Sequence, residues 1–182
     1  MSNLSVREIQ ESDIDLITQY WQGADSSFLH GMGADINKLP TKEQLSQMLS
    51  EQICQPYDKK QSYCIILTVN NKPIGHSNIN KIVFGKEAYM HLHIWDAENR
   101  NKGYGEKLVK MALPHFFEKM YLKKLYCEPY SLNPSPNKTL AKIGFQFIKE
   151  YITTPGYINF EQPVNLWELS SERLKFISPG KI

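Results

Sequence analysis

The chain has 182 residues, of which 41% are hydrophobic and 22% are charged, and its formal net charge is +2. This composition is typical of a globular protein, and a small net charge without runs of like charge argues against a nucleic-acid-binding surface. No apolar segment approaches the roughly 18 residues that a membrane helix needs, so we expect no membrane partner.

The N-terminus and the cysteines favour a reducing compartment. The first residues, MSNLSVREIQESD, lack the apolar region of a secretory signal. Cys54, Cys64 and Cys127 are an odd number and form no C-x-x-C pair, which indicates neither a disulfide framework nor a zinc site. We therefore expect a cytoplasmic protein with one domain over residues 1–182 and short tails at about 1–4 and 176–182.

The first third of the chain predicts one strand and two helices. Residues 5–13 read as a short strand leading into a helix, whose apolar face includes Trp21. The segment 22–40 is rich in Gly, Ser and Asp but contains large apolar residues, so we expect an ordered loop. Thr41 and Gln44 then form a capping box at the start of a second amphipathic helix.

The middle of the chain predicts a β-meander followed by a long helix. Three β-rich runs at 62–69, 74–84 and 88–95 are joined by short turns, so they should pair as antiparallel neighbours. Residues 105–120 carry apolar side chains at helical spacing. Pro114 lies inside this helix and should kink it.

The last part of the chain alternates between strand and helix. Residues 123–130 predict a strand, and the helix that follows has Ser135 as its expected N-cap and Gly144 as the residue that closes it. Two final strands are expected at 145–152 and 164–170.

A glycine pair marks the start of the long helix, in the run Arg100, Asn101, Lys102, Gly103, Tyr104, Gly105. A helix N-terminus exposes unpaired N–H groups and about half a positive charge, so it attracts anions. Glycines there let a phosphate approach the backbone, and Arg100 and Lys102 add positive charge. The run predicts a pyrophosphate site; an ordinary tight turn is the alternative. It matches neither the Walker pattern nor the dinucleotide fingerprint.

A second motif follows the strand at 123–130. Residues 133–145 read NPSPNKTLAKIGF and fit N-x-x-[AS]-x-x-x-[YL]-x-K-x-G-F at five positions, with Pro136 in place of the usual small residue. The matching residues are Asn133, Leu140, Lys142, Gly144 and Phe145. With the R-x-x-G-x-G run before it, the chain resembles the GCN5-related N-acetyltransferases (GNAT family) from about residue 5 to residue 170. It is most similar to the branch of ribosomal-protein N-terminal acetyltransferases.

This resemblance implies a fold and an activity. The fold is α/β: a single GNAT domain with a mixed, mostly antiparallel sheet of six to seven strands, splayed at the middle, with helices on both faces. The activity is transfer of the acetyl group of acetyl-CoA to a primary amine by direct attack in a ternary complex. The acceptor is a small-molecule amine or a protein N-terminus, and the protein is a monomer or homodimer. The alternative is a GNAT-fold module that binds acyl-CoA without turnover.

The resemblance also assigns the cofactor site. The amides of residues 100–105 would hold the pyrophosphate of acetyl-CoA, and Asn133 belongs to the same site. A backbone N–H around Ile94 and Trp95 would stabilise the tetrahedral oxyanion. A tyrosine often protonates the leaving thiolate in this family, and the chain has Leu140 there, so a dedicated general acid is in doubt.

Three residues are candidates for the general base. Glu128 is the first candidate, because some family members carry a proposed base five residues before the asparagine, although it also suits an edge carboxylate or a salt bridge. His91 and His93 share a strand face, titrate near neutrality, and resemble the strand histidines of arylalkylamine N-acetyltransferases. They could equally be structural. A metal reading of the H-x-H pair needs a third ligand, and none can be placed, so no metal is expected.

The acceptor should bind over the first two helices and their loop, as in related proteins. Trp21, Phe28 and Asp35 are the candidates there. A carboxylate such as that of Asp35 could attract a cationic amine. The alternative is that these residues only pack beneath a long loop.

Overall fold

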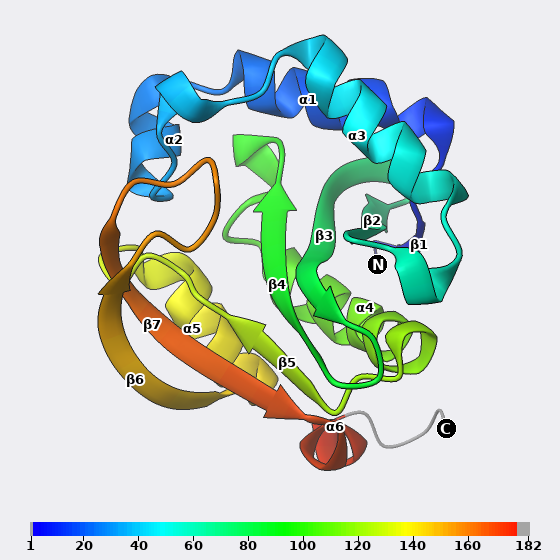
Figure 1. The fold of residues 1–182 in the computed structure, drawn as a ribbon, viewed down its shortest axis with the longest axis vertical. Helices are drawn as coiled ribbons and strands as arrows, with labels where there is room; N and C mark the ends of the chain where they lie inside the picture. Colours follow the sequence, from blue (N-terminus) through cyan, green and yellow to red (C-terminus); the bar gives the residue numbers. More distant parts are fainter. Residues whose placement is uncertain (1, 178–182) are drawn as a thin grey trace.

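The computed structural model describes residues 2–177 and shows one seven-stranded sheet with helices around it (Figure 1). The strands are β1 (Leu4–Glu8), β2 (Tyr63–Val69), β3 (Lys72–Val83), β4 (Glu87–Ile94), β5 (Lys124–Cys127), β6 (Gln146–Thr153) and β7 (Gln162–Ser170). Their order across the sheet is β1-β2-β3-β4-β5-β7-β6. The predicted meander of β2, β3 and β4 is confirmed, as is the antiparallel pair of β6 and β7.

Six α-helices accompany the sheet in the described part of the chain. They are α1 (Ile14–Gly23), α2 (Ser26–Gly31), α3 (Lys42–Cys54), α4 (Tyr104–Met120), α5 (Pro134–Ile143) and α6 (Ser171–Ile177). Short 3-10 turns include η1 (Glu11–Asp13), η2 (Ile36–Lys38), η3 (Tyr57–Lys59) and η4 (Ala97–Asn99). None of the helices within residues 2–177 combines the length and apolar character needed to cross a membrane.

The two faces of the sheet are covered by different helices. The larger core lies between the sheet and α4, where Leu113 and Phe116 are fully buried against Ile65 and Ile79 of the strands. A smaller cluster on the opposite face joins Ile17 of α1 to β2. Figure 1 shows α1, α2 and α3 along one end of the sheet and α4 behind the central strands. Helices therefore lie on both faces, as expected.

The sheet opens between its two central strands. β4 and β5 are its only parallel neighbours, and they pair from Glu87↔Lys124 to Tyr89↔Tyr126. Beyond Tyr89, β4 continues to Ile94, whereas β5 ends at Cys127. The C-terminal half of β4 therefore has an edge that no described strand covers, which confirms the predicted splay.

Several helix boundaries differ from the sequence expectation. The Thr41 and Gln44 capping box is confirmed, but Asn133 rather than Ser135 caps α5. Asn133 is the cap because its side-chain oxygen accepts the N–H of Ser135 at 3.3 Å. Part of the expected loop 22–40 is the helix α2, capped by Asp25.

The described residues include part of both expected tails. β1 already begins at Leu4, and α6 extends through Phe176 to Ile177, inside the predicted tail. The remaining part of that tail, 178–182, lies outside the described residues. Pro114 lies inside α4, as expected.

Candidate active site

The loop before α4 has the backbone of an anion site. Gly103 is the N-cap of α4 with φ 76° and ψ 3°, and Asn101 also has a positive φ of 59°. Backbone turns of this kind direct successive N–H groups to one side, where an anion can bind. No atom lies within 4 Å of the position that a Cβ on Gly103 would take, so the space in front of the helix is open.

The two glycines of this loop serve different purposes. Gly103 needs to be glycine for its left-handed backbone. A Cβ on Gly105 would lie 3.6 Å from Leu92 Cδ2, an ordinary contact, so this position only has to be small where α4 passes β4. Lys102 is exposed beside the loop and can add positive charge there.

Arg100 does not point its guanidinium at the open side of this loop. Its Nε donates to the carbonyl oxygen of Ile94 at 3.0 Å, and one terminal nitrogen donates to that of Trp95 at 2.8 Å. The guanidinium also stacks on the ring of Phe28, 4.0 Å from its centre. The expectation that Arg100 contributes its charge to the phosphates is therefore revised: its side chain ties the end of β4 to α2.

The uncovered edge of β4 presents backbone donors. The N–H of Trp95 donates to the carbonyl of Ile74 on β3 at 2.9 Å, so it is not available for an oxyanion. Since successive residues of a strand direct their backbone groups to opposite edges, the N–H of Ile94 points toward the gap between β4 and β5. Of the two predicted positions, Ile94 is the one that the geometry supports. At the apex of the gap, the Cys127 thiol donates to the Met90 carbonyl at 3.0 Å.

Glu128 lies directly after β5, at the point where the two central strands part. Its side chain is only 6% exposed, and its carboxylate accepts a hydrogen bond from the hydroxyl of Tyr151 on β6. Lys81 Nζ lies 3.6 Å from its other oxygen. Burial and the adjacent carboxylate raise the pKa of Tyr151, so this tyrosine remains a hydrogen-bond donor at neutral pH. The sequence pattern predicted Glu128 at this edge, but it did not predict the contacts with Tyr151 and Lys81.

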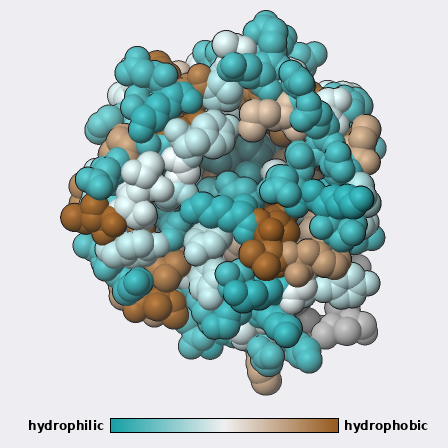
Figure 2. Space-filling model, viewed as in Figure 1, coloured by the Kyte–Doolittle hydropathy of each residue, from teal (hydrophilic) through white to brown (hydrophobic). Residues whose placement is uncertain are grey.

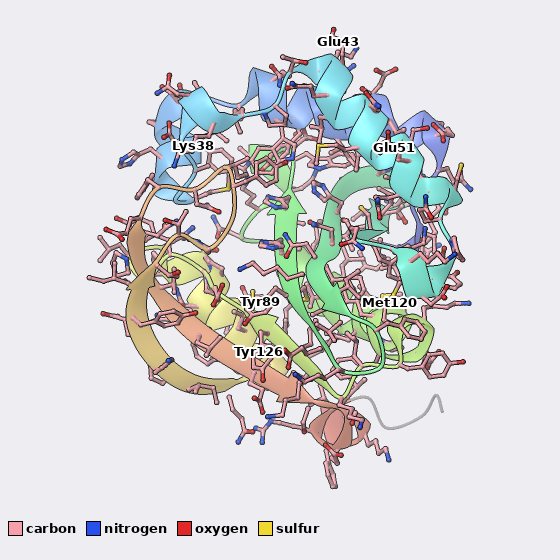
Figure 3. All side chains as sticks on the ribbon, viewed as in Figure 1. Lys38, Glu43, Glu51, Tyr89, Met120 and Tyr126 are labelled. Carbon is pink, nitrogen blue, oxygen red and sulfur yellow. The ribbon has the colours of Figure 1, made fainter. Side chains whose placement is uncertain are left out.

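Tyr89 and Tyr126 form an aromatic wall beside Glu128. Their ring centres are 5.3 Å apart, and Figure 3 shows the pair over β4 and β5 on the face toward the viewer. Lys81 Nζ lies 4.6 Å from the centre of the Tyr89 ring. Burial, and to a smaller extent the Glu128 charge, raises the pKa of Tyr89, so its hydroxyl stays neutral at pH 7.

The two predicted histidines lie on the same face but have separate environments. His91 Nε2 is 3.1 Å from the side-chain oxygen of Asn80. His93 stacks on His76 of β3, with ring centres 4.8 Å apart, and its Nδ1 lies 3.3 Å from the Tyr20 hydroxyl. His76 Nδ1 accepts the indole N–H of Trp95 at 2.8 Å, which fixes its neutral tautomer.

Burial keeps these histidines neutral. Removal from water lowers the pKa of His91 to about 4 and that of His76 to about 3, with smaller contributions from Lys81 and His91 respectively. The pKa of His93 also lies well below its usual value for the same reason. All three are therefore uncharged at pH 7 and are weak bases. No cluster of three metal-ligating side chains occurs within residues 2–177.

The predicted acceptor wall divides into two parts. Trp21 packs against His93 at 4.9 Å between ring centres, and Phe28 packs on Arg100, so both face the end of β4. The carboxylate of Asp35 instead caps η2 by accepting the N–H of Asn37 at 3.0 Å. Asp35 also lines an open depression of about 710 Å³ at the surface, with Ser26, Ser27, His30, Ala34, Ile36, Asn37 and Phe160.

A hollow lies on the face of the molecule toward the viewer (Figure 2). Figure 2 shows it between the helices at the top and the ends of β3 and β4, on a face that is mainly hydrophilic. The loop between β6 and β7 closes one side, since Asp35 N donates to the Ile158 carbonyl at 2.7 Å. Asn159 and Gln162 both donate to the carbonyl of Gly33.

The second sequence motif is structural in this part of the fold. Asn133 caps α5, and its carbonyl accepts the side-chain amide of Asn137 at 2.8 Å. Its contact with a cofactor stays a prediction. Leu140 is buried in the main core, so no general acid is available from that position.

Lys81, Tyr89 and Tyr151 complete the surroundings of Glu128, and no sequence motif indicates a role for any of them. Tyr151 lies on β6, and its approach to Glu128 depends on β7 lying between β5 and β6. Lys81 lies where the pairing of β3 with β4 shifts register between Asn80 and Val83. The only local signal for a site here is strand alternation, which places Tyr89 on the face of His91.

Comparison with known proteins identifies the family. A family model described as an acetyltransferase (GNAT) domain matches residues 3–146. A search of curated protein sequences finds no match.

Solved structures share the fold at low sequence identity. RimL, a ribosomal L7/L12 alpha-N-protein acetyltransferase in complex with coenzyme A, has a TM-score of 0.76 and 14% identity over 93% of this chain and 95% of its own. Spermidine N-acetyltransferase from Vibrio cholerae, in complex with CoA and spermine, has a TM-score of 0.76 and 16% identity over 94% and 97%. The aminoglycoside acetyltransferase AAC(6')-Ib, in complex with coenzyme A, has a TM-score of 0.73 and 15% identity over 98% and 100%.

Proposed function

This chain belongs to the GNAT acetyltransferase family, and we propose that it transfers the acetyl group of acetyl-CoA to a primary amine by direct attack in a ternary complex. The observation that carries this proposal is the gap between β4 and β5, with an open anion loop at one end and a buried carboxylate at the other. The family neighbours that act on a ribosomal protein, spermidine or an aminoglycoside all use amine acceptors, which supports the class but selects no single acceptor.

The residues of the loop fit a pyrophosphate. The left-handed backbone at Asn101 and Gly103 directs N–H groups outward, and the absence of atoms near Gly103 leaves room for a phosphate. Lys102 would add charge from the rim. In this proposal the uncovered edge of β4 hydrogen-bonds the extended part of the cofactor, as a neighbouring strand would.

Glu128 is the proposed general base. A primary amine near pKa 10 is mostly protonated at neutral pH, so it must lose a proton before it can attack. Glu128 lies at the apex of the gap with its carboxylate oriented by the Tyr151 hydroxyl. It would accept the proton while the nitrogen lone pair forms the bond to the thioester carbon. The Tyr151 hydrogen bond would keep one carboxylate oxygen in place while the other faces the acceptor nitrogen.

The histidines are weaker candidates for this step. Burial lowers the pKa of His91 to about 4, so His91 is neutral at pH 7, and its Nε2 is already engaged at 3.1 Å from the side-chain oxygen of Asn80. His93 is held between His76, Tyr20 and Trp21. We therefore propose that His93 shapes the acceptor wall, and that His91 is the alternative base only if Glu128 proves dispensable.

The rest of the reaction needs few side chains. The N–H of Ile94 is the proposed donor to the tetrahedral oxyanion, since that of Trp95 is already used. Collapse of the intermediate breaks the carbon–sulfur bond, and the electron pair leaves with sulfur. A thiol with a pKa near 8.5 is a tolerable leaving group as thiolate, so a tyrosine at the position of Leu140 is not essential.

The proposed setting is the cytoplasm. Cys54, Cys64 and Cys127 are all free thiols, which suits a reducing compartment. The oligomeric state stays a prediction of monomer or homodimer, and a related spermidine acetyltransferase is described as dodecameric.

The test is release of free thiol from acetyl-CoA in the presence of a panel of primary amines and N-terminal peptides. Each amine is paired with its tertiary N,N-dimethyl counterpart, which cannot yield a stable amide. We expect thiol release with at least one primary amine and none with its counterpart. Tight CoA binding without thiol release from any acceptor would contradict the proposal and favour the non-catalytic acyl-CoA-binding module.

A further inference from the structure

The ammonium of Lys81 occupies a site built for a cation. It lies 3.6 Å from one carboxylate oxygen of Glu128 and 4.6 Å from the centre of the Tyr89 ring. The second oxygen of Glu128 accepts the Tyr151 hydroxyl, and Tyr126 packs beside Tyr89. We call the set Tyr89, Tyr126, Glu128 and Tyr151 the ammonium cage.

The chemistry of the cage selects a positive charge over a neutral polar group. The Glu128 side chain is only 6% exposed, and a carboxylate removed from water in this way favours a cation nearby. The face of a tyrosine ring attracts a cation through its quadrupole. A neutral hydroxyl of the same size would gain neither interaction in full.

Lys81 reaches the cage from an irregular point of the sheet. Its φ is 48°, a left-handed value that is uncommon for lysine, and the pairing of β3 with β4 is interrupted there. Its side chain is 47% exposed, so the ammonium can leave toward solvent without unpacking the core. The lysine is the removable member of the cluster, because its side chain is far more exposed than that of Glu128.

The cage lies where an acceptor has to meet the thioester. Tyr89 and Tyr126 are the last pair before β4 and β5 part, and Glu128 follows at the apex of the gap. A nitrogen in the place of Lys81 Nζ would therefore be beside the base that takes its proton.

We propose that Lys81 holds the place of the acceptor nitrogen in the free protein, and that an acceptor carrying an alkylammonium group displaces it from the cage. This inference rests on the proposed acetyl transfer for its biological meaning, but binding in the cage needs neither acetyl-CoA nor turnover. A lysine side chain is itself a primary ammonium on an unbranched alkyl chain, so the site accepts ligands of that class.

The proposal has a consequence for affinity. An occupant that must leave lowers the apparent affinity of any competing ligand by the fraction of molecules in which the site is open. A half-exposed ion pair with one ring contact should keep the cage closed in most molecules, so removing the lysine should tighten ammonium binding by about tenfold.

The test is an NMR titration, without acetyl-CoA, that compares n-butylammonium chloride with n-butanol. Lys81→Asn removes the charge and suits the left-handed backbone, while Lys81→Arg keeps the charge and is the matched control. We expect Lys81→Asn to bind butylammonium about tenfold more tightly than the wild type, and Lys81→Arg to show no gain. Neither variant should bind butanol more tightly than the wild type does. Glu128→Gln added to Lys81→Asn should abolish the gain.

Equal butylammonium affinity in the wild type and Lys81→Asn, or an equal gain for butanol, would overturn the proposal. Thermal unfolding of each variant checks the fold, and Lys81→Gly provides a second neutral variant without backbone strain. Failure of acetyl transfer is recognised separately: a gain in butylammonium binding without thiol release would reject the reaction and keep the cage. Thiol release without a gain in butylammonium binding would reject the cage and keep the reaction.

Discussion

The guanidinium carbon of Arg100 lies 4.0 Å from the centre of the Phe28 ring, so the loop before α4 is joined to α2. The same guanidinium donates to the carbonyls of Ile94 and Trp95 at the end of β4. One side chain thus links the proposed acceptor wall, the strand that carries the oxyanion donor and the proposed phosphate loop. We expect these three parts to depend on each other.

Replacing Arg100 should therefore weaken the binding of both substrates. Lysine lacks the planar fork that makes the two carbonyl bonds together, so Arg100→Lys should raise KM for acetyl-CoA and for the amine by about tenfold each. Steady-state kinetics with each substrate varied in turn measures this. The matched control is Lys102→Met, which should raise only the KM for acetyl-CoA. A change confined to acetyl-CoA in Arg100→Lys would mean that the guanidinium binds phosphate after all.

Gly103 should be essential for cofactor binding. Gly103→Glu places a negative side chain in the open space before α4, where the phosphates are proposed to bind, so calorimetry should show at least a roughly hundredfold loss of CoA affinity. Gly85→Glu is the control, because Gly85 has a nearly identical φ of 77° and equally open surroundings in the turn between β3 and β4. Similar losses in both variants would trace the effect to backbone strain.

Glu128 should act on the chemical step. Glu128→Gln keeps the shape but cannot accept a proton, so kcat should fall by about 10²- to 10⁴-fold. Tyr151→Phe should cause a smaller loss, since it removes only the hydrogen bond that orients the carboxylate. Glu168→Gln is the control, because Glu168 is a carboxylate of the neighbouring strand β7 that pairs with Lys124 at 2.9 Å. If Glu128→Gln kept its kcat while His91→Asn lost it, His91 would be the base.

The buried histidines should make the fold sensitive to mild acid. The pKa of His76 falls to about 3 and that of His91 to about 4, both through burial, so the unfolded chain binds protons that the native chain does not. The contribution of these histidines to the free energy of unfolding is then fully present above the ordinary histidine pKa, and it declines as the pH falls below that value. Between about pH 7.5 and 5.5, each such histidine should cost up to about 1.4 kcal/mol.

Denaturant unfolding at these two pH values measures this loss. His91→Asn retains a side-chain amide beside Asn80 but has no titrating group, so its loss should be smaller than that of the wild type by one histidine's share. An identical loss in this variant would show that His91 does not contribute to the acid sensitivity.

Most elements of the fold could be predicted from the sequence, because their signals depend on close neighbours in the chain. The apolar spacing within 105–120 identified α4, and the Thr41 and Gln44 pair identified the start of α3. The run at 100–105 predicted a glycine pair at the start of a helix, and α4 begins there with Gly103 as its N-cap. The predicted cap of α5, Ser135, was wrong. Asn133 and Ser135 are both good caps, and only the path of the chain after β5 decides between them.

The surroundings of the candidate base were decided by tertiary structure. Lys81, Glu128 and Tyr151 come from β3, from the end of β5 and from β6, and they meet only because of the order and register of the whole sheet. The direction of Arg100, and the burial that keeps His91 neutral, also depend on elements distant in sequence. Local sequence determines which elements form, whereas contacts between them depend on packing that no short segment encodes.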